Sequence, residues 1–334
     1  MIVVSVAKFY NQVDDKKRRN TMKSSIKKIV AIIAMIATMI CSVVLLSACG
    51  VGEKNITVVA REQGSGTREA FDKVVTDGAG NYLEMKVDGK KVYNTTSTAD
   101  IQKETGNVLS KVATDVNAIG YVSLGSVNDT VKVLKVGGVT PSADSVLDGT
   151  YSIQRPFVIM TNSSVTLSDL AKDFLSYLKS DASATHAEEA GCIFLDEPAK
   201  RGKNPIQVKD FTPKAELPQG DKVVINGSTS MEKFIKKAMA GYASLYGRNA
   251  DDLFTLDLQG SSVGKSAVEN DQNGNVIGLS SAAVDEDGID SFNVCLDAVA
   301  VIVNVQNNAV NDLTLGQLYD IFSGKIVKFS QLNG

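Results

Sequence analysis

Beyond residue 55, short apolar runs alternate with glycine-rich and polar segments along the chain. From their length and composition, buried strands are predicted at 56–60, 118–124, 223–225, 254–258 and 298–305. Apolar residues at helical spacing predict helices at about 68–75, 167–180, 231–246, from 265 onward, and 315–322. Residues 77–98 fit a variable loop or a hairpin. Because strand, turn and helix recur in this order, the pattern predicts an α/β fold.

The first 50 residues follow a different pattern. Positions 29–46 are 18 consecutive uncharged residues, preceded by lysines and followed by small residues that end at Cys49. A basic stretch, an apolar stretch and small residues form a secretory signal. The sequence Leu-Ser-Ala-Cys at its end resembles the lipidation site of lipoprotein signal peptides.

We therefore expect a signal peptide at 1–48, with Met22 as an alternative start, and a tether at 49–55 that carries lipid on Cys49. The protein would then lie outside the cytoplasm, anchored to the outer face of the cell membrane. A single membrane-spanning anchor is the alternative, since 18 residues is at the lower edge of a span.

The amino-acid composition limits the classes of protein and the kinds of site that are compatible with the sequence. Apolar residues make up 43% of the 334 residues and charged residues 22%, which is globular composition and excludes a disordered chain, a fibre or a multi-span membrane protein. One histidine and four cysteines without a CxxC pair cannot form the usual zinc or redox centres. We expect no metal and no cofactor.

The net charge of the whole chain is −3, and removal of residues 1–48 would leave about −9. This balance argues against a nucleic-acid partner. An anionic ligand would have to be held by local hydrogen bonds. Cys192 and Cys295 remain in the mature part, where a disulfide and two buried thiols are equally compatible with the sequence.

Three turns between a strand and a helix combine glycine with hydroxyl residues, at 64–67, 227–230 and 260–262. The first turn of a helix has unpaired N–H groups and a partial positive charge, so such turns favour an oxyanion. The alternative is that Ser and Thr only cap the helices. Arg61, just before the first turn, is placed for a bidentate contact with an oxyanion, or for an ion pair with Glu62 or Glu69.

Two enzymatic interpretations are weaker. The sequence from Gly260 to Ser266 has three residues between its glycines where a nucleotide P-loop has four. Ser65 lacks the G-x-S-x-G frame of many serine hydrolases. His186, the only histidine, lies in a polar helical stretch and is expected on a solvated face. A serine hydrolase therefore stays a weak alternative.

The sequence REQGSGTREAF at 61–71 resembles a characteristic segment of the phosphate-binding lipoproteins of Pst-type ABC transporters, which are type II periplasmic-binding proteins. Further similar segments lie at 117–122, 155–157, 227–230, 259–262, 300–304 and 313–325. Their order is inverted relative to the usual family arrangement, which predicts a circular permutation with the proline-rich stretch at about 198–220 joining the family's usual ends. Residues near 55 and 334 should then lie close in space.

The resemblance implies a two-lobed α/β fold with a hinge, one lobe from 56–135 and 305–334 and the other from 136–304. It implies capture of inorganic phosphate between the lobes and delivery to the permease subunits of an ABC transporter, by a monomer without catalytic activity. The implied ligands of phosphate are Arg61, Ser65, Gly66, Thr67, Thr229, Ser230 and Ser261.

Some positions depart from the family pattern. Val276 stands where the family usually has an aspartate that accepts the proton of hydrogen phosphate, Ala282 replaces an arginine, and Gln63 replaces an acidic residue. Asn275 or Asp271 is the expected substitute acceptor, or selectivity against sulfate is weaker. These losses also motivate a second hypothesis, a surface lipoprotein with an altered oxyanion site that serves sensing or interaction.

Overall fold

The computed structural model describes residues 54–193 and 210–333 of the chain. The expected signal peptide with Met22, the expected lipidation site Cys49, nearly all of the expected tether and the linker prolines at 198 and 205 lie outside these residues. Within them, no helix is long and apolar enough to span a membrane.

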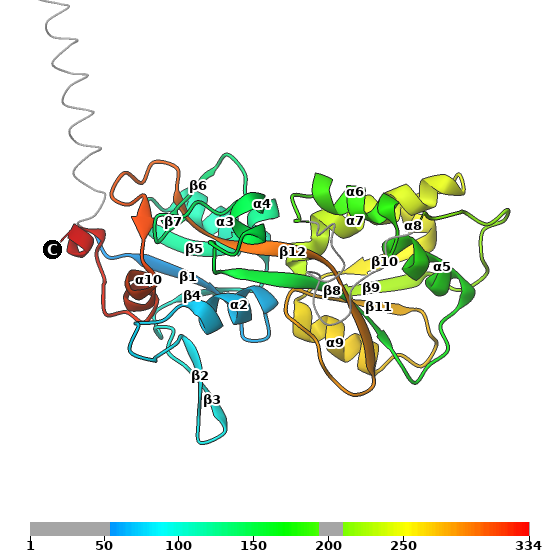
Figure 1. Ribbon diagram of the computed structural model, residues 1–334, viewed down its shortest axis with the longest axis horizontal. Coiled ribbons are helices and arrows are strands. Elements are labelled where there is room, and N and C mark those ends of the chain that lie inside the picture. The colour runs from blue at the N-terminus through cyan, green and yellow to red at the C-terminus, as the bar shows by residue number, and fades with distance from the viewer. Residues whose placement is uncertain (1–53, 194–209, 334) are drawn as a thin grey trace, which may run out of the picture. The chain divides into compact units, whose positions relative to one another are not determined.

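A nine-stranded sheet runs through the molecule (Figure 1). Its path is β10-β9-β11-β8-β12-β5-β1-β4, and β6 also pairs with β12. In chain order these strands are β1 Thr57–Arg61, β4 Asp100–Gln102, β5 Ala118–Ser123, β6 Val131–Val133, β8 Gln154–Asn162, β9 Val223–Gly227, β10 Phe254–Asp257, β11 Val276–Ser280 and β12 Ile289–Asn304.

The sheet has a parallel half at each end. β1 is parallel to β4 and β5, and β9 is parallel to β10 and β11. The long strands β8 and β12 are antiparallel to each other and join the two halves. The helices are α2 Gly66–Val74, α3 Thr105–Thr114, α4 Ala143–Leu147, α5 Asp169–Leu178, α6 Asp181–Glu189, α7 Glu232–Leu245, α8 Ala250–Leu253, α9 Ser261–Glu269 and α10 Leu315–Phe322.

Short elements complete the fold. β2 Glu84–Val87 and β3 Lys90–Tyr93 form the hairpin expected between 77 and 98, and it projects from the body in Figure 1. β7 Lys135–Val136 pairs with β13 Asp312–Leu313, and the 3-10 helices are η1 Leu124–Ser126, η3 Thr229–Met231 and η4 Phe329–Asn333. The predicted strands and helices are all present, but β12 begins nine residues earlier than expected because Asp290, Asn293 and Asp297 interrupt its apolar pattern.

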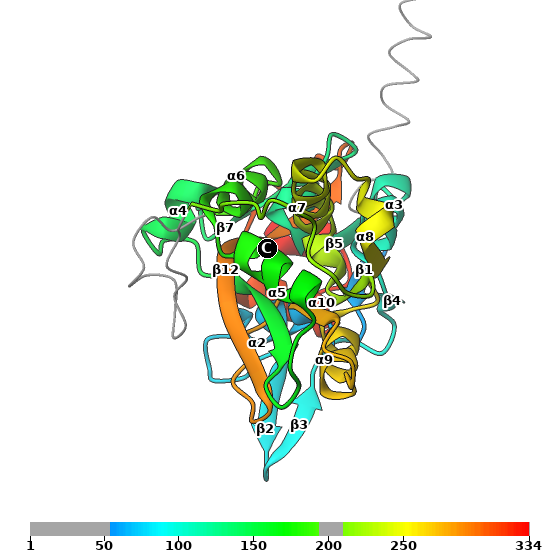
Figure 2. The same ribbon diagram turned by 90° about the vertical axis from the view of Figure 1, so that its right-hand side faces the viewer.

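The two largest hydrophobic cores lie one in each half of the sheet. Figure 2 shows α6 and α7 on the side of the molecule opposite α9. α5 and α7 pack with β9 and β11 in one core, while α2 and α10 pack with β1 and β5 in the other. Ile153, just before β8, belongs to the core of α2 and α10, whereas Phe157 in β8 belongs to the core of α5 and α7. In β12, Cys295 belongs to the core of α5 and α7, and Ala298 belongs to the core of α2 and α10. The polypeptide therefore passes from one core to the other at the start of β8 and in the middle of β12.

The segment near residue 55 lies beside the C-terminal segment. The N–H of Ile56 donates to the carbonyl oxygen of Val327 at 2.8 Å. Phe71 of α2 contacts Phe322 of α10, with ring centroids 4.8 Å apart. This proximity is what the predicted permutation requires, while the permutation itself stays a prediction.

A buried ion pair lies where β8 and β12 change cores. The Nε and Nη2 groups of Arg155 donate to Oδ2 of Asp297 at 3.0 and 2.9 Å, and Ser123 donates to Oδ1 at 2.7 Å. Both charged side chains are almost fully buried. Removal of one partner would leave a desolvated charge without compensation, whereas removal of both would not.

We therefore expect Asp297→Ala to lower the free energy of unfolding by about 3–5 kcal/mol. The double variant Arg155→Met with Asp297→Leu should recover most of this loss. Urea unfolding followed by circular dichroism measures both. An equal loss in the single and double variants would show that the charge is not the cause.

Candidate functional site

Three helical segments begin at the carboxyl ends of parallel strands. α2 follows β1, η3 and α7 follow β9, and α9 follows β10. The first N–H groups of each segment have no partner inside the helix and carry its positive partial charge. Each start is therefore suited to bind an oxyanion.

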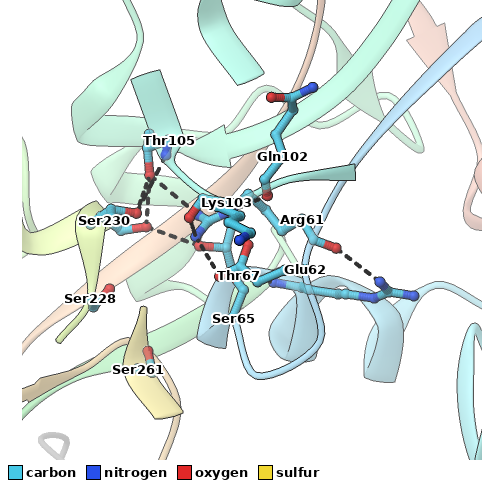
Figure 3. A network of polar contacts seen from close by, with 12 residues as sticks. Arg61, Glu62, Ser65, Thr67, Gln102, Lys103, Thr105, Ser228, Ser230 and Ser261 are labelled. Carbon is cyan, nitrogen blue, oxygen red and sulfur yellow. Dashed lines mark hydrogen bonds and ion pairs between the residues drawn. The ribbon is translucent and has the colours of Figure 1, made fainter. Parts of the chain in front are cut away.

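The three starts meet in one buried place (Figure 3). The hydroxyls of Thr67 and Ser230 are 2.9 Å apart, although 163 positions separate them in the sequence. The N–H of Ser281 donates to the Ser261 hydroxyl at 3.0 Å. A Cβ on Gly66 would lie 2.6 Å from the carbonyl carbon and from the Oγ of Ser281, so only glycine permits this approach.

All residues expected at the site are brought together here, and each side chain among them is buried: Arg61, Ser65, Thr67, Thr229, Ser230 and Ser261, with Gly66 between them. Helix capping explains only one hydroxyl. Ser65 accepts from the N–H of Arg68, whereas Ser228 and Gly260 at the other two starts make no side-chain cap bond. The other hydroxyls do not cap a helix, and they line the site.

Arg61 is held on one edge by protein groups. Its Nε and Nη2 groups donate to the two carboxylate oxygens of Glu62 at 2.9 and 3.0 Å. The same groups donate to the carbonyls of Gln102 and Lys103. The expected bidentate contact of this arginine with an oxyanion is therefore wrong for the Nε–Nη2 edge, because Glu62 occupies it. Nη1, which is 3.4 Å from the Thr105 hydroxyl, faces the site.

The structure adds three hydroxyl residues that sequence reasoning missed. Thr105, at the start of α3, contacts the hydroxyls of Thr229 and Ser230 at 3.1 and 3.4 Å. Ser228 donates to Ser281 at 2.9 Å, and Ser281 follows the end of β11. Ser228 was visible in the turn at 227–230, and Ser281 lies in the stretch between Val276 and Ala282 that was compared with the family, whereas nothing local distinguished Thr105.

The proposed substitute acceptors are not at the site. Asp271 accepts from the N–H groups of Asn273, Gly274 and Val276, which closes the turn before β11. The Asn275 side chain is half-buried and donates to the carbonyl of Lys222. Since β11 separates this turn from Ser281 by about 16 Å of extended chain, neither side chain reaches the site, and Val276 does not border it.

His186 does not lie near Ser65, so the serine hydrolase alternative has no histidine to act as its base. The Nε2 atom of His186 lies 2.8 Å from the Tyr177 hydroxyl in the core of α5, α6 and α7, so this side chain is half-buried and not on a solvated face. Ser65 caps α2 in the other half of the molecule. Among the described residues, no group of three or more His, Cys, Asp or Glu side chains is arranged to hold a metal ion.

A second arginine fixes the backbone behind the site. Nη1 of Arg68 donates to the carbonyl of Arg61 at 2.9 Å, and its Nε donates to Asp72 at 2.9 Å. Burial raises the pKa of Asp72 to about 6, although the charge of Arg68 opposes this shift. Burial also raises the pKa of Tyr121, whose hydroxyl accepts from the N–H of Arg61.

Helix starts from both halves of the sheet converge on one site. This arrangement is typical of binding proteins that have two α/β lobes. A family model described as a PBP superfamily domain matches residues 6–182 and 212–334. Phosphate-binding protein PstS 2 of Streptococcus pneumoniae is 34% identical over 280 residues, which are 83% of this chain and 87% of the relative. PstS of Bacillus subtilis is 33% identical over 131 residues, 39% of this chain and 38% of the relative.

A solved phosphate-binding protein of a phosphate ABC transporter from Streptococcus pneumoniae superposes with a TM-score of 0.59 at 34% identity, covering 83% of this chain and 99% of the other. The chain belongs to the PBP superfamily and, within it, to the PstS family. Its fold is the type II periplasmic-binding-protein fold that the sequence predicted.

The raised pKa of Asp72 makes stability depend on pH with a defined sign. Between its ordinary value of 3.8 and about 6, the folded protein retains a proton that the unfolded chain has lost. Stability from this group is therefore greatest below pH 4, falls as the pH rises to 6, and is constant above.

We expect the stability of the wild type relative to Asp72→Asn to fall by about 2 kcal/mol between pH 4 and pH 7. Urea unfolding at several pH values measures this difference. Asp77→Asn is the control of opposite sign, because hydrogen bonds chiefly from Asn81 lower the pKa of Asp77. A difference between wild type and Asp72→Asn that is constant with pH would contradict the prediction.

Proposed function

We propose that this protein is an extracytoplasmic, lipid-anchored solute-binding protein that captures inorganic phosphate between two lobes and delivers it to an ABC permease. The observation that carries the proposal is the convergence of three helix starts with one guanidinium in a buried place. The names of the relatives support phosphate as the ligand. Cys49 is the proposed site of lipidation, and the binding protein acts as a monomer without catalysis.

The proposed ligands of phosphate are the seven expected residues together with Thr105 and Ser281. The added residues contribute hydroxyls that face the same helix starts. A hydrogen bond to a charged group contributes about 1.5–3 kcal/mol. Several such bonds supply the roughly 8 kcal/mol of micromolar binding after the loss of free energy on closure.

Hydroxyl groups also supply the proton acceptor in this proposal. Hydrogen phosphate carries a proton that sulfate lacks, and a serine or threonine oxygen can accept it. The Ser281 hydroxyl accepts from Ser228, and in its contact with the Ser261 hydroxyl either group can donate. A hydroxyl can also rotate to donate, so it rejects sulfate less strongly than a carboxylate would.

The arrangement of lobes and the order of segments belong to the same proposal. We infer that the division between lobes lies at the start of β8 and in the middle of β12, where the two cores meet, whereas the sequence predicted 135 and 305. A chain in permuted order would match a relative of usual order over only part of its length. The Bacillus subtilis protein matches 39% of the chain, as this expectation requires, but the pneumococcal protein matches 83%, so the permuted order stays a proposal.

We expect Arg61→Ala to weaken phosphate binding by at least about 2 kcal/mol, or about 30-fold, because it removes a cationic donor and leaves Glu62 unpaired beside the anion. Adding Glu62→Gln should recover part of this loss. Isothermal titration calorimetry with phosphate and with sulfate measures binding, and Arg248→Ala, an exposed arginine, is the charge-matched control. Wild-type protein without any phosphate signal would instead favour the sensing or interaction hypothesis.

Gly66→Ala should weaken phosphate binding at least about tenfold, because a methyl group at this position would force the backbone at Ser281 away from α2. Gly316→Ala is the matched control, since its added Cβ would meet only the Thr314 hydroxyl at 3.9 Å. The same calorimetric titration compares the two. Equal affinities for phosphate would mean that the approach of Gly66 to Ser281 is not needed for binding.

A further inference from the structure

A third segment passes between the two cores, besides β8 and β12. It leaves the C-terminal end of α6 at Gly191 and pairs with β12 through Ile193, where the two N–H groups of Ile193 and Leu296 donate to each other's carbonyls at 2.8 Å. Cys192 packs against the core of α5 and α7, and the next residue, Ile193, is buried in the other core.

Cys295 has the same position on β12 that Cys192 has on this segment. Each cysteine comes directly before a member of the Ile193–Leu296 pair, and each packs against the core of α5 and α7. Both cysteines are free thiols. Burial raises the pKa of the Cys295 thiol, and the hydrogen bond and charge of neighbouring Cys192 raise it further.

The surroundings leave the two thiols little freedom to separate. A Cβ on Gly191 would lie 2.9 Å from the Cα of Gly125 in η1, so the chain before Cys192 is packed tightly. On the other side, β12 is paired with β8 on both sides of Cys295. The two side chains are therefore held as neighbours by backbone pairing and packing.

We propose that Cys192 and Cys295 are a disulfide-forming pair that links the third crossing segment to β12. The oxidant is a small-molecule or protein disulfide of the oxidising environment, a setting that rests on the proposed extracytoplasmic location. The half-buried Cys192 thiolate attacks this disulfide and releases one thiolate. The Cys295 sulfur, as thiolate, then attacks the Cys192 sulfur and releases the second. Two thiols are oxidised and one external disulfide is reduced to two thiols.

The test is oxidation of the purified full chain with oxidised glutathione, followed by alkylation and peptide mapping without reduction. We expect one cross-linked peptide pair that contains Cys192 and Cys295, two hydrogens lighter than the reduced peptides, and its loss on treatment with dithiothreitol. Since the bond closes a loop of about 100 residues, the Tm should rise by about 5 °C or more on oxidation.

Two variants isolate each step of the exchange. Cys295→Ser should accumulate a glutathione adduct on Cys192 and show no rise in Tm, while Cys192→Ser should leave Cys295 unmodified. The wild-type map is decisive if a variant does not fold. Recovery of both cysteines as alkylated thiols after oxidation, or a stable glutathione adduct on wild-type Cys192, would overturn the proposal. This outcome is independent of phosphate binding, which the calorimetry above measures separately.

Discussion

The approach of the α2 N-terminus to the backbone at Ser281 is the contact on which the site depends. It brings β1 and α2, from one half of the sheet, against the end of β11 from the other half, because position 66 has no side chain to hold them apart. Since the Ser281 N–H also donates to Ser261, the same contact fixes the start of α9. The helix dipoles of α2 and α9 therefore point to one place because position 66 carries no side chain.

Neighbouring groups compensate the charge of Arg61, which explains how a site suited to an oxyanion can exist in a protein of net negative charge. Glu62 and two backbone carbonyls hold the guanidinium, so little net positive charge remains to attract an anion from a distance. Binding must then come from short-range dipoles: hydroxyls and helix N–H groups that are already oriented before the ligand arrives. A protein of net negative charge can use this mechanism, since dipoles act over a few ångströms where the surface charge is less important.

The sequence was sufficient for local features of the site and insufficient for those made by distant segments. Strand, turn and helix are adjacent in the chain, so the three helix starts and Arg61 could be predicted from composition and spacing. Thr105 and Ser281 enter only through the register of β4 and β11 with their neighbours, which a single sequence does not encode locally. The comparison of Val276 with the family aspartate was misleading for the same reason. The pairing of β11 in the sheet decides that Val276 lies at the start of this strand, away from the site.

The contact between residues 56 and 327 shows why an inverted order of segments is compatible with this fold. β1 and α2 come from the start of the described chain, while α10 comes from its end, yet Phe71 and Phe322 pack together and with Tyr121 of β5 in one core. Each core thus forms from packing between segments, whatever their order along the polypeptide. What the order does change is which segments must cross between the cores, and here β8, β12 and the segment that contains Cys192 do so together.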